Sequence, residues 1–272
     1  MTHSTTTVRP AAVAGMFYPG SAGALTRDLQ RLLRDTPRPP GARPKAIIAP
    51  HAGYVYSGPI AASVYASLQA LRTSIRRVVL LGPTHRVAVD GLAVPSASAF
   101  ATPLGDVPLD TGAIASIAQL PQVVVSDAAH AMEHSLEVQL PFLQTVLERF
   151  ALVPLAVGDA SPTAVAEVLE TLWGGDETLI VISSDLSHYL PYALACKSDT
   201  DTARHIVALD AHLDHRQACG ATPVNGLLLA ARRHGLRAEM LDLRNSGDTA
   251  GDKSRVVGYG AFSFVPVNAN AH

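Results

Sequence analysis

Two apolar runs that each end at a histidine constrain the fold of this chain more than any other feature. The run AIIA at 46–49 leads through Pro50 into His51, and the run VVLL at 78–81 leads through Gly-Pro-Thr into His85. Short apolar runs bounded by proline and glycine are typical of strands in a sheet that is covered on both faces. Open α/β sheets place their functional sites outside the carboxyl ends of such strands. We therefore predict that both imidazoles lie at one edge of the sheet.

The order of apolar and amphipathic segments predicts one α/β domain with a mostly parallel or mixed central sheet flanked by helices. Strands are expected at 46–49, 77–81, 123–125, 151–157, 178–183, 237–244 and 256–265. Helices are expected at 23–33, 60–71, 110–119, 135–149 with an interruption near Pro141, 162–173, 195–218 and 223–234. Residues 50–59 are expected to form a loop, and 92–108 a hairpin or irregular loop. The domain is expected to span 8–266, with flexible termini at 1–7 and 267–272.

Composition excludes several classes of partner. The chain has 272 residues and a net charge of −2, without long runs of one sign, which argues against nucleic acid or an anionic membrane as a partner. It contains neither a stretch of signal-peptide type nor the roughly 20 apolar residues that a membrane span needs, so we expect a cytoplasmic protein. Cys196 and Cys219 form no CxxC pair and are expected to be buried, unreactive thiols.

Two further histidines lie in segments that mix polar and apolar residues. His134 lies in EHSLE between Glu133 and Glu137, and His188 ends the sequence SSDLSH. Four imidazoles converging on one pocket would select a divalent transition metal, since neutral imidazole is a common ligand of such ions. The structural alternative is that each histidine only caps a strand or lies on the surface.

Two aspartates are candidates for the same site. Asp185 precedes His188 by three residues after a buried strand, so its carboxylate is placed to orient the imidazole for acid–base work. The alternative is a helix-capping aspartate beside a surface histidine. Asp248 lies in the glycine-rich segment NSGDTAGD, where it either forms a turn or completes a site of two imidazoles and one carboxylate.

The chain lacks the sequence motifs of several enzyme classes. The serines at 183 and 184 lack a GxSxG elbow, which argues against a serine hydrolase. The chain also lacks an HExxH helix, a P-loop and a GxGxxG turn, so zincin, nucleotide triphosphate and dinucleotide sites are not predicted.

Together these segments resemble the MEMO-like family, the B component of the AmmeMemoRadiSam system. The resemblance runs nearly end to end, through RPAAVAGMFYPG, APHAGYVYSG, GPTH, ATPLG, EHSLEVQLPFL, SSDLSHY and GDKSRVVGYGAF. That family is similar in fold to the catalytic subunit of class III extradiol dioxygenases, which hold non-haem iron in an α/β domain. The resemblance therefore implies a class III extradiol dioxygenase-like fold.

By this resemblance, His51 and His85 match the two metal-binding histidines, and His188 matches the histidine that acts as an acid–base or substrate-orienting group. Animal members have a cysteine as third ligand, in the loop before the final strand. Here that loop contains no cysteine, so Asp248 either replaces the ligand or the ligand is absent. A carboxylate favours iron and a thiolate favours copper. We expect iron(II), with copper or zinc as alternatives.

The leading hypothesis is a metal-dependent oxidoreductase of the dioxygenase type. His51, His85 and Asp248 would bind the metal, Asp185 would orient His188, and His188 and His134 would act in catalysis. The alternatives are a non-enzymatic protein that binds a metal or a peptide in a dioxygenase-like pocket, and metal-dependent hydrolysis. The substrate, a small molecule or a peptide, is not identified by the sequence. Animal members are described as binding phosphotyrosine peptides, and no residue here is assigned to that role.

The resemblance also implies partners. The name of the system implies association with a radical SAM protein and an AMMECR-type protein. A homodimer is expected only from the frequency of two-fold oligomers.

Overall fold

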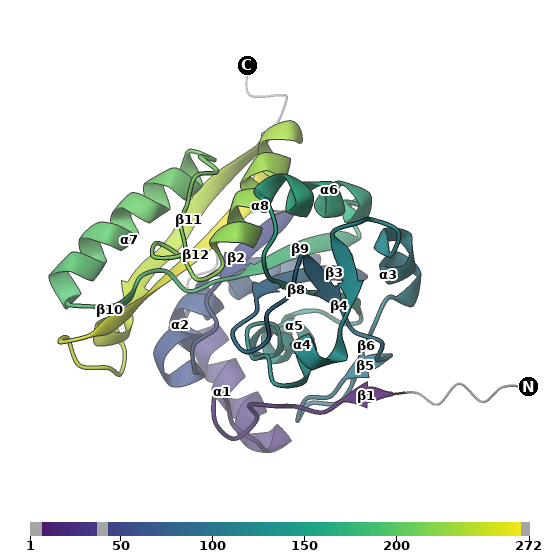
Figure 1. Ribbon diagram of the computed structural model, residues 1–272. Coiled ribbons are helices and arrows are strands. Elements are labelled where there is room, and N and C mark those ends of the chain that lie inside the picture. The colour runs from purple at the N-terminus through teal and green to yellow at the C-terminus, as the bar shows by residue number, and fades with distance from the viewer. Residues whose placement is uncertain (1–6, 37–42, 268–272) are drawn as a thin grey trace, which may run out of the picture.

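Four parallel strands form the centre of the main sheet (Figure 1). In spatial order they are β2 (Ala46–Ala49), β9 (Thr178–Ser183), β3 (Arg77–Pro83) and β8 (Ala151–Val157). The computed structural model describes residues 7–36 and 43–267. The four strands are buried along almost their whole length, which explains why each reads as a continuous apolar run.

Antiparallel pairs extend this centre on both sides. Next to β2 lies β12 (Val256–Pro266), which also pairs with β11 (Leu236–Asn245) and β10 (His188–Leu190). Next to β8 lies β4 (Leu92–Val94), which pairs in parallel with β7 (Val123–Val125). A small separate sheet joins β1 (Val8–Arg9), β5 (Ala99–Phe100) and β6 (Val107–Pro108). The prediction of one α/β unit with a mixed sheet is thus confirmed.

Helices pack on both faces of the sheet and divide the core into two clusters. Alternate residues of β2 and β3 contribute to opposite clusters: Ile47, Val78 and Leu80 to the first, and Ile48, Val79 and Leu81 to the second. This is the pleat of a strand, whose successive side chains point to opposite faces. The sheet is therefore the wall between two apolar layers.

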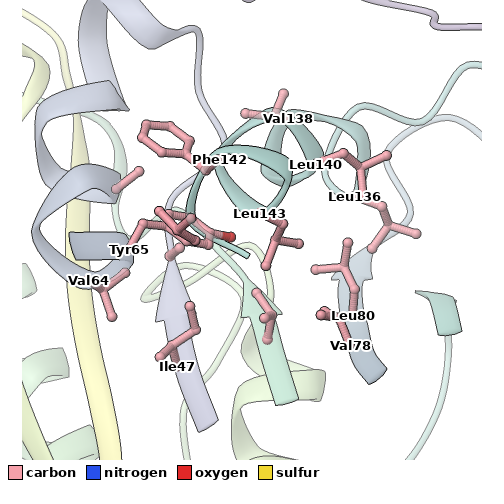
Figure 2. Packing of buried hydrophobic residues seen from close by; sticks show 14 of the residues in the cluster. Ile47, Val64, Tyr65, Val78, Leu80, Leu136, Val138, Leu140, Phe142 and Leu143 are labelled. Atoms are coloured by element: carbon pink, nitrogen blue, oxygen red, sulfur yellow. The ribbon is translucent and has the colours of Figure 1, made fainter. Parts of the chain in front are cut away.

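The first layer is formed by α1 (Ala22–Arg34), α2 (Tyr54–Tyr65), η1 (Ala66–Leu71) and α5 (Leu140–Val146). Figure 2 shows Tyr65 and Phe142 above the strands, where their rings stack with centroids 4.9 Å apart. The second layer is formed mainly by α3 (Thr111–Ile117), α6 (Pro162–Leu172) and α8 (Ala221–Arg233). The longest helix, α7 (Tyr192–Val207), packs against β11 and β12.

Three predicted helix boundaries were wrong. Helix α2 begins at Tyr54 and contains Pro59, so 54–59 is helical and not a loop. Pro59 lacks a backbone N–H, so the helix loses one backbone hydrogen bond near its start. The predicted helix 135–149 is reduced to η2 (Glu137–Gln139) and α5, because Pro141 lies in the first turn of a new helix. Helix α7 ends at Val207, where Leu209 adopts a positive φ of 55°.

Two short helices were not predicted, α4 (Asp127–Ala131) and η3 (Ser246–Asp248). Most of the predicted flexible termini, 1–6 and 268–272, lies outside the described residues. None of the helices in the described ranges combines the length and the apolar character that crossing a bilayer requires.

Because Leu80 is fully buried in a central strand, truncating it leaves a cavity that the sheet cannot close. We expect Leu80→Ala to lower the free energy of unfolding by about 2–5 kcal/mol in urea denaturation. The matched control is Val125→Ala, at an exposed strand position, where the change should stay within about 0.5 kcal/mol. Equal effects of the two substitutions would contradict this account of the core.

Candidate metal centre

Three adjacent parallel strands deliver polar side chains to one edge of the sheet. His51 follows β2, His85 follows β3, and Asp185 follows β9, which lies between them. His134 reaches the same place from the loop before η2. The prediction that imidazoles from distant segments meet at the carboxyl edge is confirmed for these three histidines.

The three imidazoles form a compact group. One ring nitrogen from each of His51, His85 and His134 lies within 4.8 Å of the others, so the group can hold a metal ion. The rings of His85 and His134 stack with centroids 4.6 Å apart, and the ring of His51 stands edge-on to both. His51 is buried, whereas the side chain of His85 is 30% exposed. The group thus lies mostly below the surface, and His85 and His134 are partly exposed to solvent.

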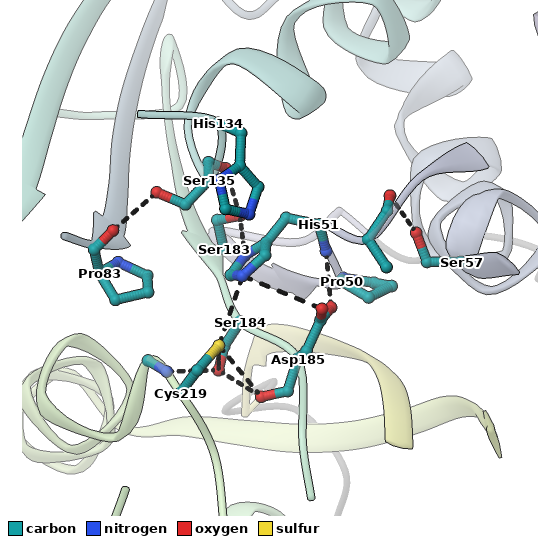
Figure 3. Close-up of polar contacts among 12 residues, drawn as sticks. Pro50, His51, Ser57, Pro83, His134, Ser135, Ser183, Ser184, Asp185 and Cys219 are labelled. Atoms are coloured by element: carbon teal, nitrogen blue, oxygen red, sulfur yellow. Dashed lines mark hydrogen bonds and ion pairs between the residues drawn. The ribbon is translucent and has the colours of Figure 1, made fainter. Parts of the chain in front are cut away.

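Hydrogen bonding fixes which ring nitrogen of His51 is free. Its Nδ1 lies 2.9 Å from Ser183 Oγ, and that hydroxyl already donates its only hydrogen to Ser135 O. The Nδ1 must therefore carry the proton and donate it, which leaves the lone pair on Nε2 free. Figure 3 shows this chain of contacts. His51 is held in the tautomer that a metal ion requires.

The carboxylate of Glu133 does the same for His85. It accepts hydrogen bonds from His85 Nδ1 at 2.8 Å, from the backbone N of His85 at 2.6 Å, and from the backbone N of His134 and Ser135 at 2.9 Å each. Burial alone would raise the pKa of Glu133, but the hydrogen bonds and the attraction of His85 outweigh it and lower the pKa to about 2. A carboxylate acceptor makes Nδ1 of His85 the donor, so in the neutral imidazole the lone pair lies on Nε2.

The sequence reasoning missed Cys219. Its Sγ lies 3.3 Å from Nε2 of His51, so the thiol faces the nitrogen that the tautomer leaves free. The segment before α8 approaches β9 closely, because a Cβ at Gly220 would lie 2.8 Å from the side chain of Ser184. Burial raises the pKa of the Cys219 thiol to about 12. The sequence feature that could have indicated Cys219 was its position in a Cys-Gly pair directly before a helix.

Asp185 and His188 are both near the centre, but they do not form the predicted pair. The Oδ1 of Asp185 accepts a hydrogen bond of 2.8 Å from the backbone N of His51, and its Oδ2 lies 4.0 Å from Nε2 of His51. His188 instead directs its Nδ1 to Leu186 O at 2.9 Å. Asp185 therefore orients the His51 segment, and a backbone carbonyl orients His188.

The structure does not bring Asp248 to the imidazoles. Its carboxylate accepts a hydrogen bond from the Tyr192 hydroxyl at 2.6 Å and caps η3 through the backbone N of Asn245. The predicted ligand set of His51, His85 and Asp248 is therefore not assembled. The physical reason is local, because one oxygen of this carboxylate caps the short turn and the other accepts from Tyr192 at the start of α7.

A cleft of about 760 Å³ gives access to this centre. Its lining includes His85, His188 and Cys219, together with Tyr189 and the loop at 214–217. Because Nδ1 of His188 must donate to a carbonyl, its Nε2 lone pair is free. The cleft therefore presents an imidazole acceptor beside the group of potential metal ligands.

The buried imidazoles predict a loss of stability in acid. Burial is the main reason that the pKa is lowered to about 3 for His51 and to about 4 for His134. The unfolded chain takes up these protons below about pH 6.5, whereas the folded chain does not, so stability falls as the pH drops. We expect urea unfolding of the metal-free protein to show about 2 kcal/mol less stability at pH 5 than at pH 7 for each such histidine.

The matched variant is His134→Asn, which removes one of these imidazoles. Its stability should depend less steeply on pH than that of the wild type between pH 7 and pH 5. Stability curves of equal slope for the two proteins would contradict this view of the site.

Comparisons with known proteins place the whole chain in a family. The sequence model of the Memo-like protein family matches residues 9–263. A MEMO1 family protein of Ignicoccus hospitalis is 38% identical over 283 residues, covering 94% of this chain and 98% of that protein. A MEMO1 family protein of Aquifex aeolicus is 37% identical over 264 residues, covering 93% and 97%. An uncharacterized protein from Escherichia coli K12 has a solved structure that superposes with a TM-score of 0.49 at 14% identity, covering 79% of this chain and 98% of that chain. Since the family model and the two MEMO1 family proteins match nearly the whole chain, this protein belongs to the Memo-like protein family.

Proposed function

We propose that this protein is a metal-dependent oxidoreductase whose metal ion is held by the imidazoles of His51, His85 and His134 and by the sulfur of Cys219, which would lose its proton on binding. The observation that carries the proposal is the convergence of these groups at the carboxyl edge of the sheet, beneath a cleft. The substrate is a molecule small enough to enter that cleft.

The donor set fits a transition metal. Imidazole and thiol ligands suit iron, copper and zinc, whereas magnesium and calcium prefer oxygen ligands. Two of the imidazoles are held with Nε2 unprotonated, and the ring orientation is fixed by Ser183 and Glu133. Such supporting hydrogen bonds are a regular part of metal sites in proteins. Because Asp248 lies elsewhere, the carboxylate that favoured iron is lost, and Cys219 makes copper an equal candidate.

If His51, His85, His134 and Cys219 hold a redox-active ion, that ion would supply electron transfer to or from a bound substrate. The chain itself supplies binding and proton movement. His188 faces the cleft with a free Nε2, so it can accept a proton from a hydroxyl group of the substrate. Its Nδ1 stays bonded to Leu186 O, which holds the imidazole in place during that transfer.

The binding part of the proposal is tested by metal content after anaerobic purification. We expect the wild type to carry close to one iron or copper per chain in elemental analysis, and His51→Ala, His85→Ala and Cys219→Ser to carry much less. The matched control is His212→Ala, a surface histidine outside the site, which should keep the wild-type content. Equal metal content in all five proteins would overturn the assigned ligands.

The catalytic part is tested separately. With the reduced metal loaded, the wild type should consume oxygen when catechols are added, and His188→Gln should lose at least about tenfold in rate while keeping its metal. A protein that binds metal but turns over no catechol under these conditions would favour the non-enzymatic alternative.

A further inference from the structure

A segment near the N-terminus, residues 8–20, crosses the loop that carries Glu133 and His134. We call it the N-terminal strap. Its first anchor is Arg9, which is buried. The guanidinium donates to His130 O at 2.8 Å, to Glu133 O at 2.7 Å and to a carboxylate oxygen of Glu137 at 2.5 Å. One side chain of the strap therefore holds three points of the loop at once.

The second anchor is the carboxylate of Glu137, which is fully buried. Besides Arg9, it accepts hydrogen bonds from the backbone N of Ala12 at 2.7 Å, from the backbone N of Val13 at 2.9 Å and from the hydroxyl of Tyr18 at 2.6 Å. All of its partners belong to the strap. A buried carboxylate with this many partners is a rigid connection, because losing any of them leaves a polar group unsatisfied.

The third anchor is a ring contact at the metal centre itself. The turn of the strap places Phe17 against the imidazole of His134, with ring centroids 4.8 Å apart. The carbonyl oxygen of Phe17 also accepts a hydrogen bond of 2.7 Å from the backbone N of Tyr54. Tyr54 begins α2, three residues after His51. The strap thus touches the segments of two of the three imidazoles.

We propose that the N-terminal strap sets the geometry of the metal centre and that Arg9 is its positioning residue. Arg9 fixes the backbone of Glu133, and the carboxylate of Glu133 fixes His85 and the backbone of His134. None of the strap residues is a ligand in this arrangement. The inference rests on the proposed metal site, but it concerns affinity and coordination geometry and not the reaction.

The shape of the guanidinium matters as well as its charge. Its planar fork reaches two carbonyl oxygens and a carboxylate in different directions, whereas a lysine ammonium is a single point of charge. The guanidinium also lies 5.0 Å from the centroid of the Phe100 ring. A lysine at position 9 would keep the ion pair with Glu137 and lose the hydrogen bonds to the carbonyl oxygens of His130 and Glu133.

The test is the affinity for Co²⁺, followed by its visible absorption spectrum. The main variant is Arg9→Met with Glu137→Gln, which removes both buried charges together and so avoids leaving one unpaired. We expect the folded double variant to bind Co²⁺ about 10- to 100-fold more weakly than the wild type, with an altered spectrum. The matched control is Arg31→Met with Asp28→Asn, which removes an ion pair on the surface of α1 and should change neither reading.

Two single variants keep the inference open to refutation if the double variant does not fold. Phe17→Leu retains an apolar side chain and removes only the ring against His134, and Arg9→Lys retains only the charge. Both should weaken Co²⁺ binding while circular dichroism shows a folded protein. If the folded variants bind Co²⁺ with the affinity and spectrum of the wild type, the inference is overturned. Wild-type binding by Arg9→Lys alone would also overturn the role of Arg9, because it would show that the charge at position 9 is sufficient.

The outcomes separate this inference from the proposed function. If the wild type binds no Co²⁺, or if His51→Ala and His85→Ala bind it as well as the wild type does, the metal site itself is wrong and the inference falls with it. If those ligand variants lose binding while the strap variants keep it, only the positioning role of the strap is refuted.

Discussion

The buried carboxylate of Glu133 is the interaction on which the candidate site depends. It accepts hydrogen bonds from the backbone and ring of His85 and from the backbone of His134 and Ser135. A buried carboxylate is stable only when its charge is compensated, so these bonds are needed by the fold as much as by the site. Through them a loop from one part of the chain is tied to the end of a central strand. The position of His85 therefore depends on the conformation of the loop that carries Glu133.

Close packing of backbone makes this arrangement possible. A Cβ at Gly82 would lie 2.8 Å from Ser135 Oγ, so only glycine allows the loop to lie against the end of β3. Gly220 has the same function for the segment that carries Cys219. In both places the residue without a side chain lets a polar group from a distant segment reach the sheet edge. The candidate ligands are far apart in the sequence, and these two close backbone contacts bring them together.

The parts of the site that the sequence predicted are those that depend on strands. His51 and His85 follow continuous apolar runs, and parallel strands bring their carboxyl ends to one edge, so their meeting could be derived from pattern alone. The strand 46–49 was predicted with its observed limits for the same reason. Asp185 follows the strand between them and was also placed correctly at that edge. The predicted pairing of Asp185 with His188 was wrong. A spacing of three residues does not determine the direction in which either side chain points.

The parts that were not predicted depend on loops. Asp248 and Cys219 both lie in glycine-containing segments, and only the folded backbone shows that one caps η3 while the other faces His51. Glu137 is a polar residue inside an apolar segment, and its partner is the strap near the N-terminus. Contacts between segments more than a hundred residues apart leave no local pattern in the sequence. The same is true of the contact between Phe17 and His134.

The account as a whole rests on imidazoles and a thiol sharing one ion. The most direct measurement is the X-ray absorption spectrum of the zinc-loaded protein, in which nitrogen and sulfur neighbours are resolved by distance. The account predicts imidazole nitrogens at about 2.0–2.1 Å and one sulfur at about 2.3 Å, with the sulfur absent in Cys219→Ser. A first shell of oxygen atoms alone, or a sulfur signal that survives that substitution, would contradict it.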